Sequence, residues 1–500
     1  MKRIGAALVF VLALGGAARA EAPRVRVETG VLVGEATDRA EIFRDIPFAA
    51  PPTGALRWKP PAPAAPWDGE RAAVEKGPSC PQPMKPDGTP NFGAANGAIS
   101  EDCLQLNVFA PKAEARHGPA PVMVWLHGGG NTVGAAWIYD GQAFARDGVI
   151  VVTTNYRLGP LGFFAHPALT REAKPDEPLG NYGLMDQIAA LEWVKRNIAA
   201  FGGDPNNVTV FGESAGGSDT LALLATPKAW PLFNKAIVES GGGWAPSPTL
   251  AAAEADGAQR AEKLGLAGAK ATAAALRAVP IDELVPKAWA GMSSPIVDGR
   301  LMPKSIARAF ADGTVADVPL IIGANSGEDS LIALFGRKPE AIYARAPRWM
   351  KPNYPEDPAA AGREMFADWL MVAPARWIAA RAAGGQPAWL YHFSYVGTRF
   401  RAQGVTRAAH AAEIQYVFEY WGRRTPMSMV SDEDKAMAGL MHGCWVAFAR
   451  TGRPDCPSGE PWPAYDPATD KLMAFGAQSG VLQGFRKEPL DSAQVLGLPN

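Results

Sequence analysis

The 500-residue chain is poor in cysteine and histidine, with four and six residues respectively, and it carries no excess of charge. Its 49 basic and 50 acidic residues leave a net charge of −1, so no basic surplus points to nucleic acid as a partner. The chain contains no CxxC pair and no histidine-rich spacing that would predict a zinc site. Apolar residues are abundant at 47%, against 20% charged, which excludes strong disorder and allows a large core.

Only the N-terminus has the pattern of a targeting segment. Lys2 and Arg3 precede the apolar run 4–14, and Ala18-Arg19-Ala20 supplies the small-x-small pattern that a signal peptidase requires. The run is shorter than the ~20 apolar residues of a membrane-spanning helix. The pattern predicts a cleaved signal peptide over 1–20, export to the periplasm or beyond the cell, and no membrane span. The alternative is an anchoring or buried first helix.

The four cysteines follow from that prediction, because an exported chain folds in an oxidising compartment. Pairing by proximity joins Cys80 to Cys103 and Cys444 to Cys456. Each short loop closed in this way would stabilise the fold by ~3 kcal/mol if the effect is mainly on chain entropy. Four cysteines allow three pairings, so the sequence alone leaves this one a prediction.

Short apolar runs bounded by turn residues predict the strands of a sheet that is covered on both faces. Such strands, alternating with helices, indicate an α/β fold with a central, mostly parallel sheet and helical insertions. Length alone favours two domains, but the strands of one sheet are spread from 122 to 393, so we expect a single domain over 21–500. The expected strands are 121–126, 149–153, 207–211, 235–238, 318–322 and 388–393, with an antiparallel hairpin at 24–33. The expected helices are 183–200, insertions at 250–276 and 331–371, and a final helix at 433–449, with an ordered proline-rich loop at 47–66.

One serine stands in a Gly-x-Ser-x-Gly motif, Gly212-Glu213-Ser214-Ala215-Gly216, directly after the expected strand 207–211. The glycines permit a sharp turn between strand and helix that exposes the serine at the edge of the sheet. The helix that follows adds partial positive charge where an oxyanion would form. The motif therefore predicts Ser214 as a nucleophile on an α/β-hydrolase fold.

A second glycine-rich segment, His127-Gly128-Gly129-Gly130, follows the strand 121–126. Glycines let backbone N–H groups approach a ligand closely, as a tetrahedral intermediate requires. Alone, the segment is equally typical of a flexible loop or an anion site. Together with the serine motif it predicts an oxyanion hole, with the N–H of Ala215 as a further donor.

The base and the acid are predicted from chain order, since this fold uses serine, acid and histidine in that sequence. Of the six histidines, His392 lies in a strand and His442 on the last expected helix, while three others precede Ser214. His410, in a loop after the strand 388–393, is therefore the expected base. The acid follows the strand 318–322, where both Glu328 and Asp329 stand and the spacing does not choose between them.

Several further motifs resemble the type-B carboxylesterase family, which includes the cholinesterases. The resemblance extends over essentially all of the chain after residue 20. The matching segments are Glu101-Asp-Cys-Leu-Gln-Leu-Asn-Val108, Asn155-Tyr-Arg-Leu-Gly159, Gly180-Asn-Tyr-Gly-Leu184, Phe201-Gly-Gly-Asp-Pro205, 212–217, His410-Ala-Ala-Glu-Ile414, Trp445-Val-Ala-Phe-Ala449 with Thr451-Gly452, and Trp462-Pro-Ala-Tyr465.

The resemblance implies a Ser-His-Glu triad of Ser214, His410 and Glu328, although Gly327-Glu328-Asp329 departs from the family's Asp-Glu-Gly acid loop. It implies oxyanion donors at Gly129, Gly130 and Ala215. Glu213 and Ser240 match buried polar positions that support the nucleophile. The resemblance also supports the disulfide between Cys80 and Cys103.

Four residues bear on substrate choice. Asn131 stands where the family commonly has an aromatic residue, which predicts a more polar pocket edge. Trp244 either walls the acyl pocket or packs in the core. Arg399 and Arg401, on the approach to His410, either attract an anionic ester or serve solubility.

The sequence thus predicts a serine carboxylesterase that acts on a small-molecule ester through an acyl-enzyme and needs no metal or organic cofactor. Two alternatives stay open: an inactive binding or adhesion protein on the same fold, and a secreted amidase or peptidase with the same triad. The natural substrate and the oligomeric state are not readable from the sequence.

Overall fold

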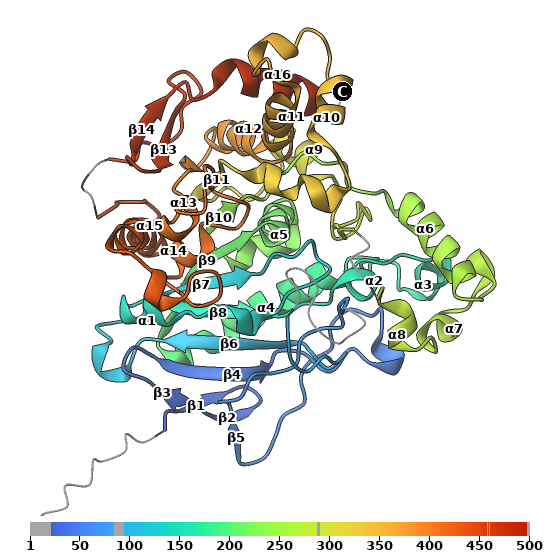
Figure 1. The fold of residues 1–500 in the computed structure, drawn as a ribbon. Helices are drawn as coiled ribbons and strands as arrows, with labels where there is room; N and C mark the ends of the chain where they lie inside the picture. The colour runs from blue at the N-terminus through green and yellow to red at the C-terminus, as the bar shows by residue number, and fades with distance from the viewer. Residues whose placement is uncertain (1–21, 85–94, 288–290, 458, 460, 498–500) are drawn as a thin grey trace, which may run out of the picture.

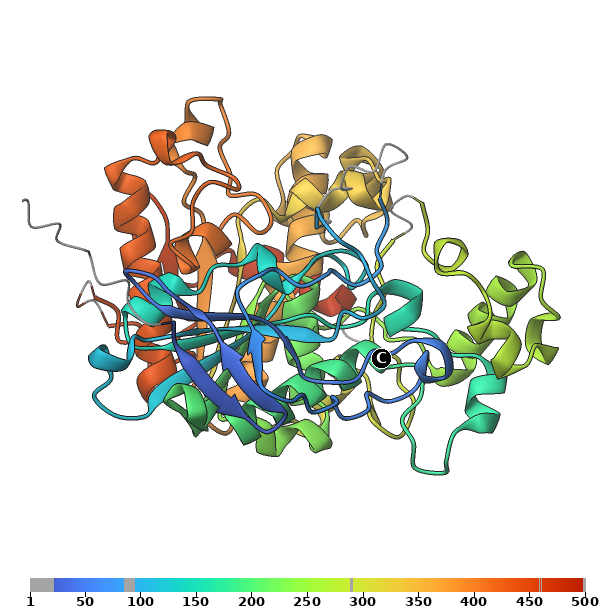
Figure 2. The same cartoon turned by 90° about the horizontal axis from the view of Figure 1, so that it is seen from below.

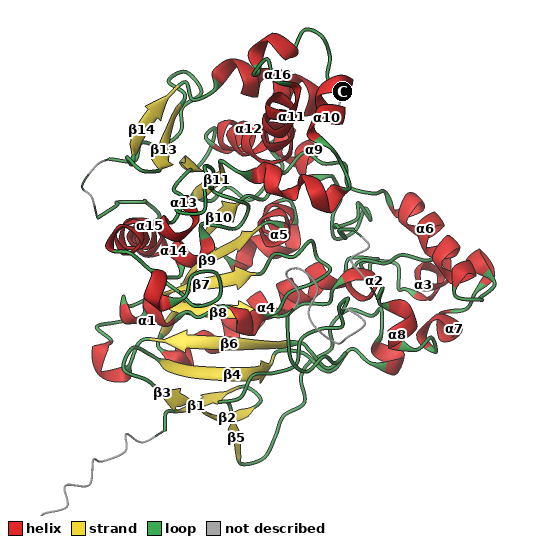
Figure 3. Cartoon of the chain, viewed as in Figure 1, coloured by secondary structure: helices red, strands yellow, loops and turns green. Residues whose placement is uncertain are grey.

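The computed structural model describes residues 22–84, 95–287, 291–457, 459 and 461–497. Within them, an 11-stranded sheet runs through the molecule, with helices around it (Figures 1 and 3). Its strands, in spatial order, are β14 (Gly480–Gln483), β13 (Lys471–Phe475), β12 (Ala388–Phe393), β11 (Leu320–Asn325), β10 (Lys235–Glu239), β9 (Gly203–Glu213), β7 (Ala120–Leu126), β8 (Ile150–Thr154), β6 (Gln105–Ala110), β4 (Glu41–Pro47) and β3 (Glu35–Ala36).

The seven strands from β13 to β8 run parallel to one another. At one end of the sheet β14 pairs antiparallel with β13, and at the other end β6 pairs antiparallel with β8, β4 with β6, and β3 with β4. The α/β-hydrolase prediction with a mostly parallel central sheet is therefore confirmed. The six expected sheet strands are all present. The sheet joins strands from residues 35 to 483.

A second sheet lies beside β3 and β4 at the start of the chain (Figure 1). Its strands β1 (Arg24–Val27) and β2 (Gly30–Val33) form the antiparallel hairpin that the sequence predicts, and β5 (Glu70–Ala72) joins β2 in parallel. The proline-rich loop that follows β4 is ordered, since Trp58 is only 2% exposed and its Nε1 donates to the carbonyl of Pro160 at 2.8 Å.

Apolar side chains of the central strands point alternately to the two faces of the sheet. They form part of two hydrophobic cores, one on each face. Val124 of β7 belongs to one core and its neighbour Trp125 to the other. Helices therefore cover both faces (Figure 2). The first core includes side chains of α4 (Tyr182–Asn197), α5 (Ala215–Leu224), α9 (Ile306–Ala311), α12 (Ala373–Ala382) and α16 (Lys487–Gly497), and the second includes those of α1 (Gln142–Arg146), α14 (Ile414–Val417) and α15 (Asp432–Thr451).

The expected insertions are helical but broken into short pieces. One group stands away from the sheet in both views (Figures 1 and 2) and contains α3 (Pro167–Glu172), α6 (Leu250–Lys263), α7 (Ala273–Arg277) and α8 (Ile281–Leu284). The other contains the 3₁₀ helix η7 (Glu328–Phe335), α10 (Pro339–Arg345), α11 (Pro358–Ala367) and the π-helical η9 (Asp368–Val372). The remaining pieces are α2 (Gly159–Gly162), α13 (Thr398–Arg401), and the 3₁₀ helices η1 (Gly54–Leu56), η2 (Ala113–Ala115), η3 (Ala136–Ile138), η4 (Ile198–Phe201), η5 (Pro227–Leu232), η6 (Gly268–Lys270), η8 (Lys351–Asn353) and η10 (Met427–Met429).

One prediction is wrong: the helix expected at 433–449, observed as α15, is not the last, because β13, β14 and α16 follow it. β13 and β14 are short, with five and four residues, so their sequences alone did not distinguish them from the end of a helix or a loop. Both expected disulfides are present, joining Cys80 to Cys103 and Cys444 to Cys456. The predicted signal peptide lies outside the described residues, and within these no helix is long and apolar enough to cross a membrane.

Candidate active site

Three parallel strands end side by side where the sequence places its catalytic candidates. Glu213 at the end of β9 pairs with Glu239 at the end of β10, which pairs in turn with Gly323 of β11. Carboxyl ends of parallel strands meet at one edge of the sheet, so the loops that follow them converge. These loops carry Ser214, Ser240 and Glu328.

Ser214 occupies the turn between β9 and α5. Its backbone has φ 56° and ψ −121°, a conformation rarely adopted by residues other than glycine, and its N–H donates to the carbonyl of Glu239 at 2.9 Å. Gly216 allows α5 to start so close to β7 that a Cβ there would lie 2.0 Å from the carbonyl oxygen of Leu126. The motif therefore forms the strained strand-to-helix turn that the sequence predicts, with the serine half-buried at its apex.

The structure brings Glu328, and not Asp329, to the candidate base. His410 Nδ1 donates to Glu328 Oε2 at 2.6 Å, which fixes the proton on Nδ1 and leaves Nε2 as the acceptor nitrogen. Glu328 Oε1 accepts from Ser240 Oγ at 2.6 Å and from the N–H of Asn325 at 2.8 Å. Asp329 instead pairs with Arg407 at 2.7 Å.

The second nitrogen of His410 lies beside the residue that precedes the candidate nucleophile. Nε2 is 3.1 Å from Glu213 Oε1, but neither atom makes a hydrogen bond within the described residues. Burial lowers the pKa of His410, but the negative charges of Glu213 and Glu328 outweigh it, and the net shift is upward. Burial also raises the pKa of Glu213. Where Glu213 is ionised, its charge therefore adds to that of Glu328 in favouring the protonated form of His410.

The glycine-rich loop after β7 faces the same turn. A Cβ on Gly128 would lie 2.7 Å from Glu213 Oε2 and 3.1 Å from Ser214 Cβ, so the loop and the serine are in close contact. Gly129 and Gly130 have φ 103° and 64°, and no acceptor from the described part of the chain bonds to their N–H groups. Together with the N–H of Ala215 at the start of α5, they are available to an oxyanion.

A network of buried hydrogen bonds, which the sequence did not lead us to expect, holds the glycine-rich loop in place. Tyr156 OH donates to the backbone carbonyl of His127 at 2.6 Å and to Asn131 Oδ1 at 3.0 Å. Asn131 Nδ2 donates to Asp219 Oδ1 at 2.9 Å, and Gln187 Nε2 donates to Asp219 Oδ2 at 2.6 Å. Burial raises the pKa of Asp219 to about 7. The only sequence signal was that Tyr156 lies in one of the family segments.

Two predictions about the substrate pocket are not favoured by this geometry. Asn131 is 1% exposed and both ends of its amide are bonded in the interior, so it does not offer a polar pocket edge. Trp244 is 3% exposed, lies in the core and donates from Nε1 to the carbonyl of Trp369 at 2.7 Å. Core packing is therefore the alternative that the structure favours for Trp244.

Besides Glu328, three glutamates are buried at this edge of the sheet: Glu213, Glu239 and Glu413, each at most 3% exposed. Trp445 Nε1 donates to Glu239 Oε1 at 2.8 Å, and Asn325 Nδ2 donates to Glu413. Burial raises the pKa of all three carboxyls. Protons therefore remain on these side chains to higher pH than on exposed glutamates, which relieves the repulsion between them.

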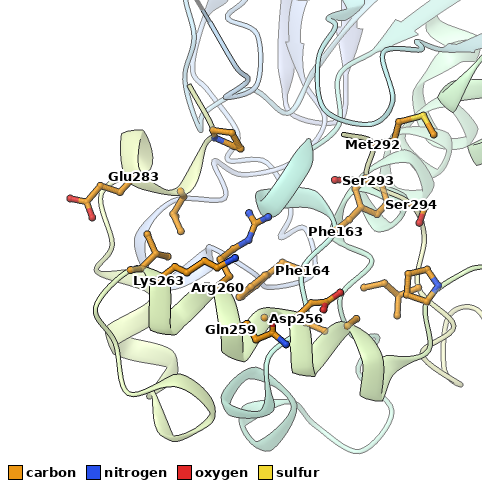
Figure 4. A pocket seen from close by; sticks show the side chains of 18 residues that line it. Phe163, Phe164, Asp256, Gln259, Arg260, Lys263, Glu283, Met292, Ser293 and Ser294 are labelled. Carbon is orange, nitrogen blue, oxygen red and sulfur yellow. The ribbon is translucent and has the colours of Figure 1, made fainter. Parts of the chain in front are cut away.

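A cavity of about 570 Å³ lies between α6 and residues of the segments 283–286 and 292–296 (Figure 4). Arg260 and Lys263 of α6 lie beside each other on one wall, and Met292 and Ser293 lie at the other end. The N–H of Ser293 donates to the carbonyl of Gly130 at 2.9 Å, so the cavity adjoins the back of the glycine-rich loop. Among the described residues, none of the three triad candidates lines it.

Comparison with known proteins agrees with this geometry. The sequence model of the carboxylesterase family matches residues 21–346 and 336–492. Fumonisin B1 esterase from Sphingopyxis macrogoltabida is 36% identical over 545 aligned positions, covering 99% of this chain and 95% of that protein. Para-nitrobenzyl esterase from Bacillus subtilis is 33% identical, covering 91% of this chain and 95% of that one.

Solved structures give the same relationship in three dimensions. A structure titled PNB esterase superposes with a TM-score of 0.82 at 32% sequence identity, covering 94% of this chain and 99% of the other. One titled thermophylic PNB esterase gives a TM-score of 0.79 at 31% identity, with the same coverage. The chain therefore belongs to the carboxylesterase family and is a carboxylic ester hydrolase with the α/β-hydrolase fold.

Proposed function

We propose that the chain hydrolyses carboxylic esters by two-step acyl transfer, with Ser214 as nucleophile, His410 as general base and Glu328 as the orienting acid. Ser214 Oγ attacks the ester carbonyl while His410 Nε2 takes its proton. The tetrahedral intermediate collapses, His410 returns the proton to the leaving alcohol, and the acyl group stays on Ser214. Water activated by His410 then releases the carboxylic acid.

The observation that carries the proposal is the chain of short hydrogen bonds from His410 Nδ1 through Glu328 to Ser240 and the N–H of Asn325. Glu328 is fully buried and held by three donors, so the imidazole has one tautomer and one orientation. The imidazolium that forms during attack is stabilised by a carboxylate that does not have to move.

The oxyanion would be held by the backbone N–H groups of Gly129, Gly130 and Ala215. Fixed donors of this kind contribute much of the rate because they need no reorganisation as charge develops, and loss of one typically costs ~10²–10³ in rate. The buried bonds of Tyr156 and Asn131 support this assignment, since they keep the loop in one conformation.

For the setting of the reaction, we keep the proposals of an exported chain, folded as one domain over 21–500 and acting on a small-molecule ester. Two disulfides are in keeping with an oxidising compartment. The names of the relatives, which include a fumonisin B1 esterase and a para-nitrobenzyl esterase, support an ester substrate.

The decisive test replaces the nucleophile. Ser214→Ala should lower hydrolysis of 4-nitrophenyl butyrate by at least ~10⁴-fold and abolish labelling by a fluorophosphonate, because no other group can form the acyl-enzyme. Unchanged thermal unfolding serves as the control for folding. Turnover retained in this variant would contradict the mechanism, and a wild-type chain that does not label would indicate an inactive binding protein instead. Matched amide substrates separate an esterase from an amidase.

A further inference from the structure

Three arginines follow one another along the rim of the candidate active site. Arg424 Nη2 donates to the backbone carbonyl of His410 at 3.1 Å, and Arg399 Nη1 donates to the backbone carbonyl of Arg424 at 2.8 Å. The charge of Arg423, the neighbour of Arg424, acts on the hydroxyl group of Tyr139. Both Arg423 and Arg424 are exposed residues.

None of these three guanidinium groups pairs with a carboxylate of the described residues within 4.0 Å. The nearby arginines differ in this respect. Arg401, on the same helix as Arg399, pairs with Glu433, and Arg407 pairs with Asp329. Of the two arginines that the sequence singles out, Arg401 is therefore neutralised, while Arg399 lies behind Arg424, a residue that the sequence reasoning did not consider.

The charges of Arg423 and Arg424 reach the reaction centre. Burial lowers the pKa of His127 to about 4, and the charge of Arg423 adds to the effect. The charge of Arg424 acts on the carboxyl of Glu213, the residue before Ser214. The hydrogen bond of Arg424 to the backbone carbonyl of His410 places this arginine beside the candidate base, and Arg423 is its neighbour in the chain.

A plain alternative is that the arginines offset the buried glutamates. Burial raises the pKa of Glu213, Glu239 and Glu413, so these carboxyls hold protons to higher pH than exposed glutamates, and the charge of Arg424 offsets only part of this shift at Glu213. Glu328 is already bonded by His410, Ser240 and Asn325. Arg423 and Arg424 are thus exposed next to the candidate base and have no carboxylate of the described residues within 4.0 Å, which is the arrangement that an anionic group on the substrate would complete.

We propose that the chain selects esters that carry a carboxylate near the scissile bond, and that Arg424 and Arg423 bind that carboxylate. The inference rests on the proposed esterase function and narrows its substrate class. A guanidinium pairs with a carboxylate through two parallel hydrogen bonds, which gives both orientation and strength. Arg399 holds the backbone of Arg424 and so has a positioning role.

The test compares two esters that differ only in a terminal carboxylate. Mono-4-nitrophenyl glutarate carries it, and 4-nitrophenyl valerate has a methyl group in its place. A second pair, 3-acetoxybenzoate and 3-acetoxybenzamide, places the charge on the alcohol side. We expect the wild-type chain to prefer the anionic member of at least one pair in kcat/KM, and the preference to fall with added salt.

The variants then locate the preference. Arg424→Gln, alone and with Arg423→Gln, should lower kcat/KM for the anionic ester roughly tenfold more than for its neutral partner, since a hydrogen-bonded charge is removed. Arg401→Gln is the matched control, because Arg401 already has a carboxylate partner, and it should leave the ratio of the two esters unchanged.

The possible outcomes distinguish failure of this inference from failure of the proposed esterase function on which it rests. Hydrolysis of the neutral esters without any preference for the anionic ones overturns the inference and leaves the esterase function standing. A preference that survives in the double variant, or that falls equally in Arg401→Gln, overturns the role of these arginines. Failure to hydrolyse any of the four esters counts against both the inference and the proposed function.

Discussion

The floor and the rim of the candidate site are built differently. On the floor, Glu328, Asn131 and Asp219 are at most 1% exposed, and each is held by at least two hydrogen bonds. On the rim, Arg423 and Arg424 are exposed, and in η10, which follows them in the chain, Met427 and Met429 are 63% and 52% exposed. The difference indicates that the floor fixes the reacting groups, whereas the rim meets the variable part of the substrate.

The largest effect that this comparison predicts is on the floor. Glu328→Gln keeps the shape of the side chain but removes its charge and presents an amide to His410 Nδ1. The favoured tautomer of His410 and the stabilisation of its charged form are both lost, so kcat should fall by ~10³–10⁴-fold. Hydrolysis of 4-nitrophenyl butyrate at saturating concentration measures it.

Asp329→Asn is the matched control one residue away. Asp329 pairs with Arg407, at 2.7 Å, and makes no bond to His410. Its loss should change kcat by less than about tenfold, as expected of a partly exposed ion pair. If Asp329→Asn proved the more damaging of the two, the acid would have to be reassigned.

The next effect concerns the loop rather than the triad. Asn131 has φ 54°, which asparagine tolerates better than alanine, and its side chain ties the loop to Asp219 and Tyr156. Asn131→Ala should lower kcat by ~10–100-fold, below the full loss of an oxyanion donor. Binding of a trifluoromethyl ketone, which forms an oxyanion on the enzyme, should weaken in parallel.

Asn131→Gly separates backbone from side chain at this position. Glycine adopts a positive φ without strain but restores neither hydrogen bond. A variant as active as the wild type would show that only the backbone conformation matters, and the network through Tyr156 and Asp219 would then have no part in holding the loop.

The same division between floor and rim explains what could be predicted from the sequence. Ser214 and the glycine-rich loop each follow a central apolar strand, so local pattern and chain order located them. The antiparallel strands β4 and β6 were missed because their sequences mix polar and apolar residues, and the pairing of β4 with β6 has an irregularity between Phe43 and Ile46. Local periodicity does not reveal such strands, which are defined by their neighbours.

Contacts between segments that lie far apart in the sequence could not be predicted from it either. Asp219 bonds to Asn131 across 88 positions of chain, and Arg424 meets His410 only because a loop folds back on itself. No spacing rule connects these residues. For the same reason the choice between Glu328 and Asp329 needed the family pattern and not the sequence alone, whereas in the structure a single hydrogen bond distinguishes them.

A smaller effect is expected at Glu213, the buried glutamate beside His410. His410 must be unprotonated to accept a proton, so kcat/KM should fall as the pH drops through its pKa. The charge of Glu213 helps to raise that pKa, and Glu213→Gln removes the charge at every pH. The acid limb should therefore move to lower pH by about one unit. A limb that stayed in place, measured with a neutral ester, would mean that Glu213 does not act on His410.

The smallest effect is expected in η10, the exposed segment that follows Arg423 and Arg424 in the chain. Met427 is 63% exposed and Met441 of α15 is fully buried, which makes them a matched pair of methionines. Met427→Ala should change the free energy of unfolding by less than about 0.5 kcal/mol, while Met441→Ala should cost roughly 2–5 kcal/mol because it leaves a cavity in the core. Denaturant unfolding of both variants measures the difference. A large cost at Met427 would mean that its side chain packs as closely as that of buried Met441. Selectivity could then not be altered in this segment without loss of stability.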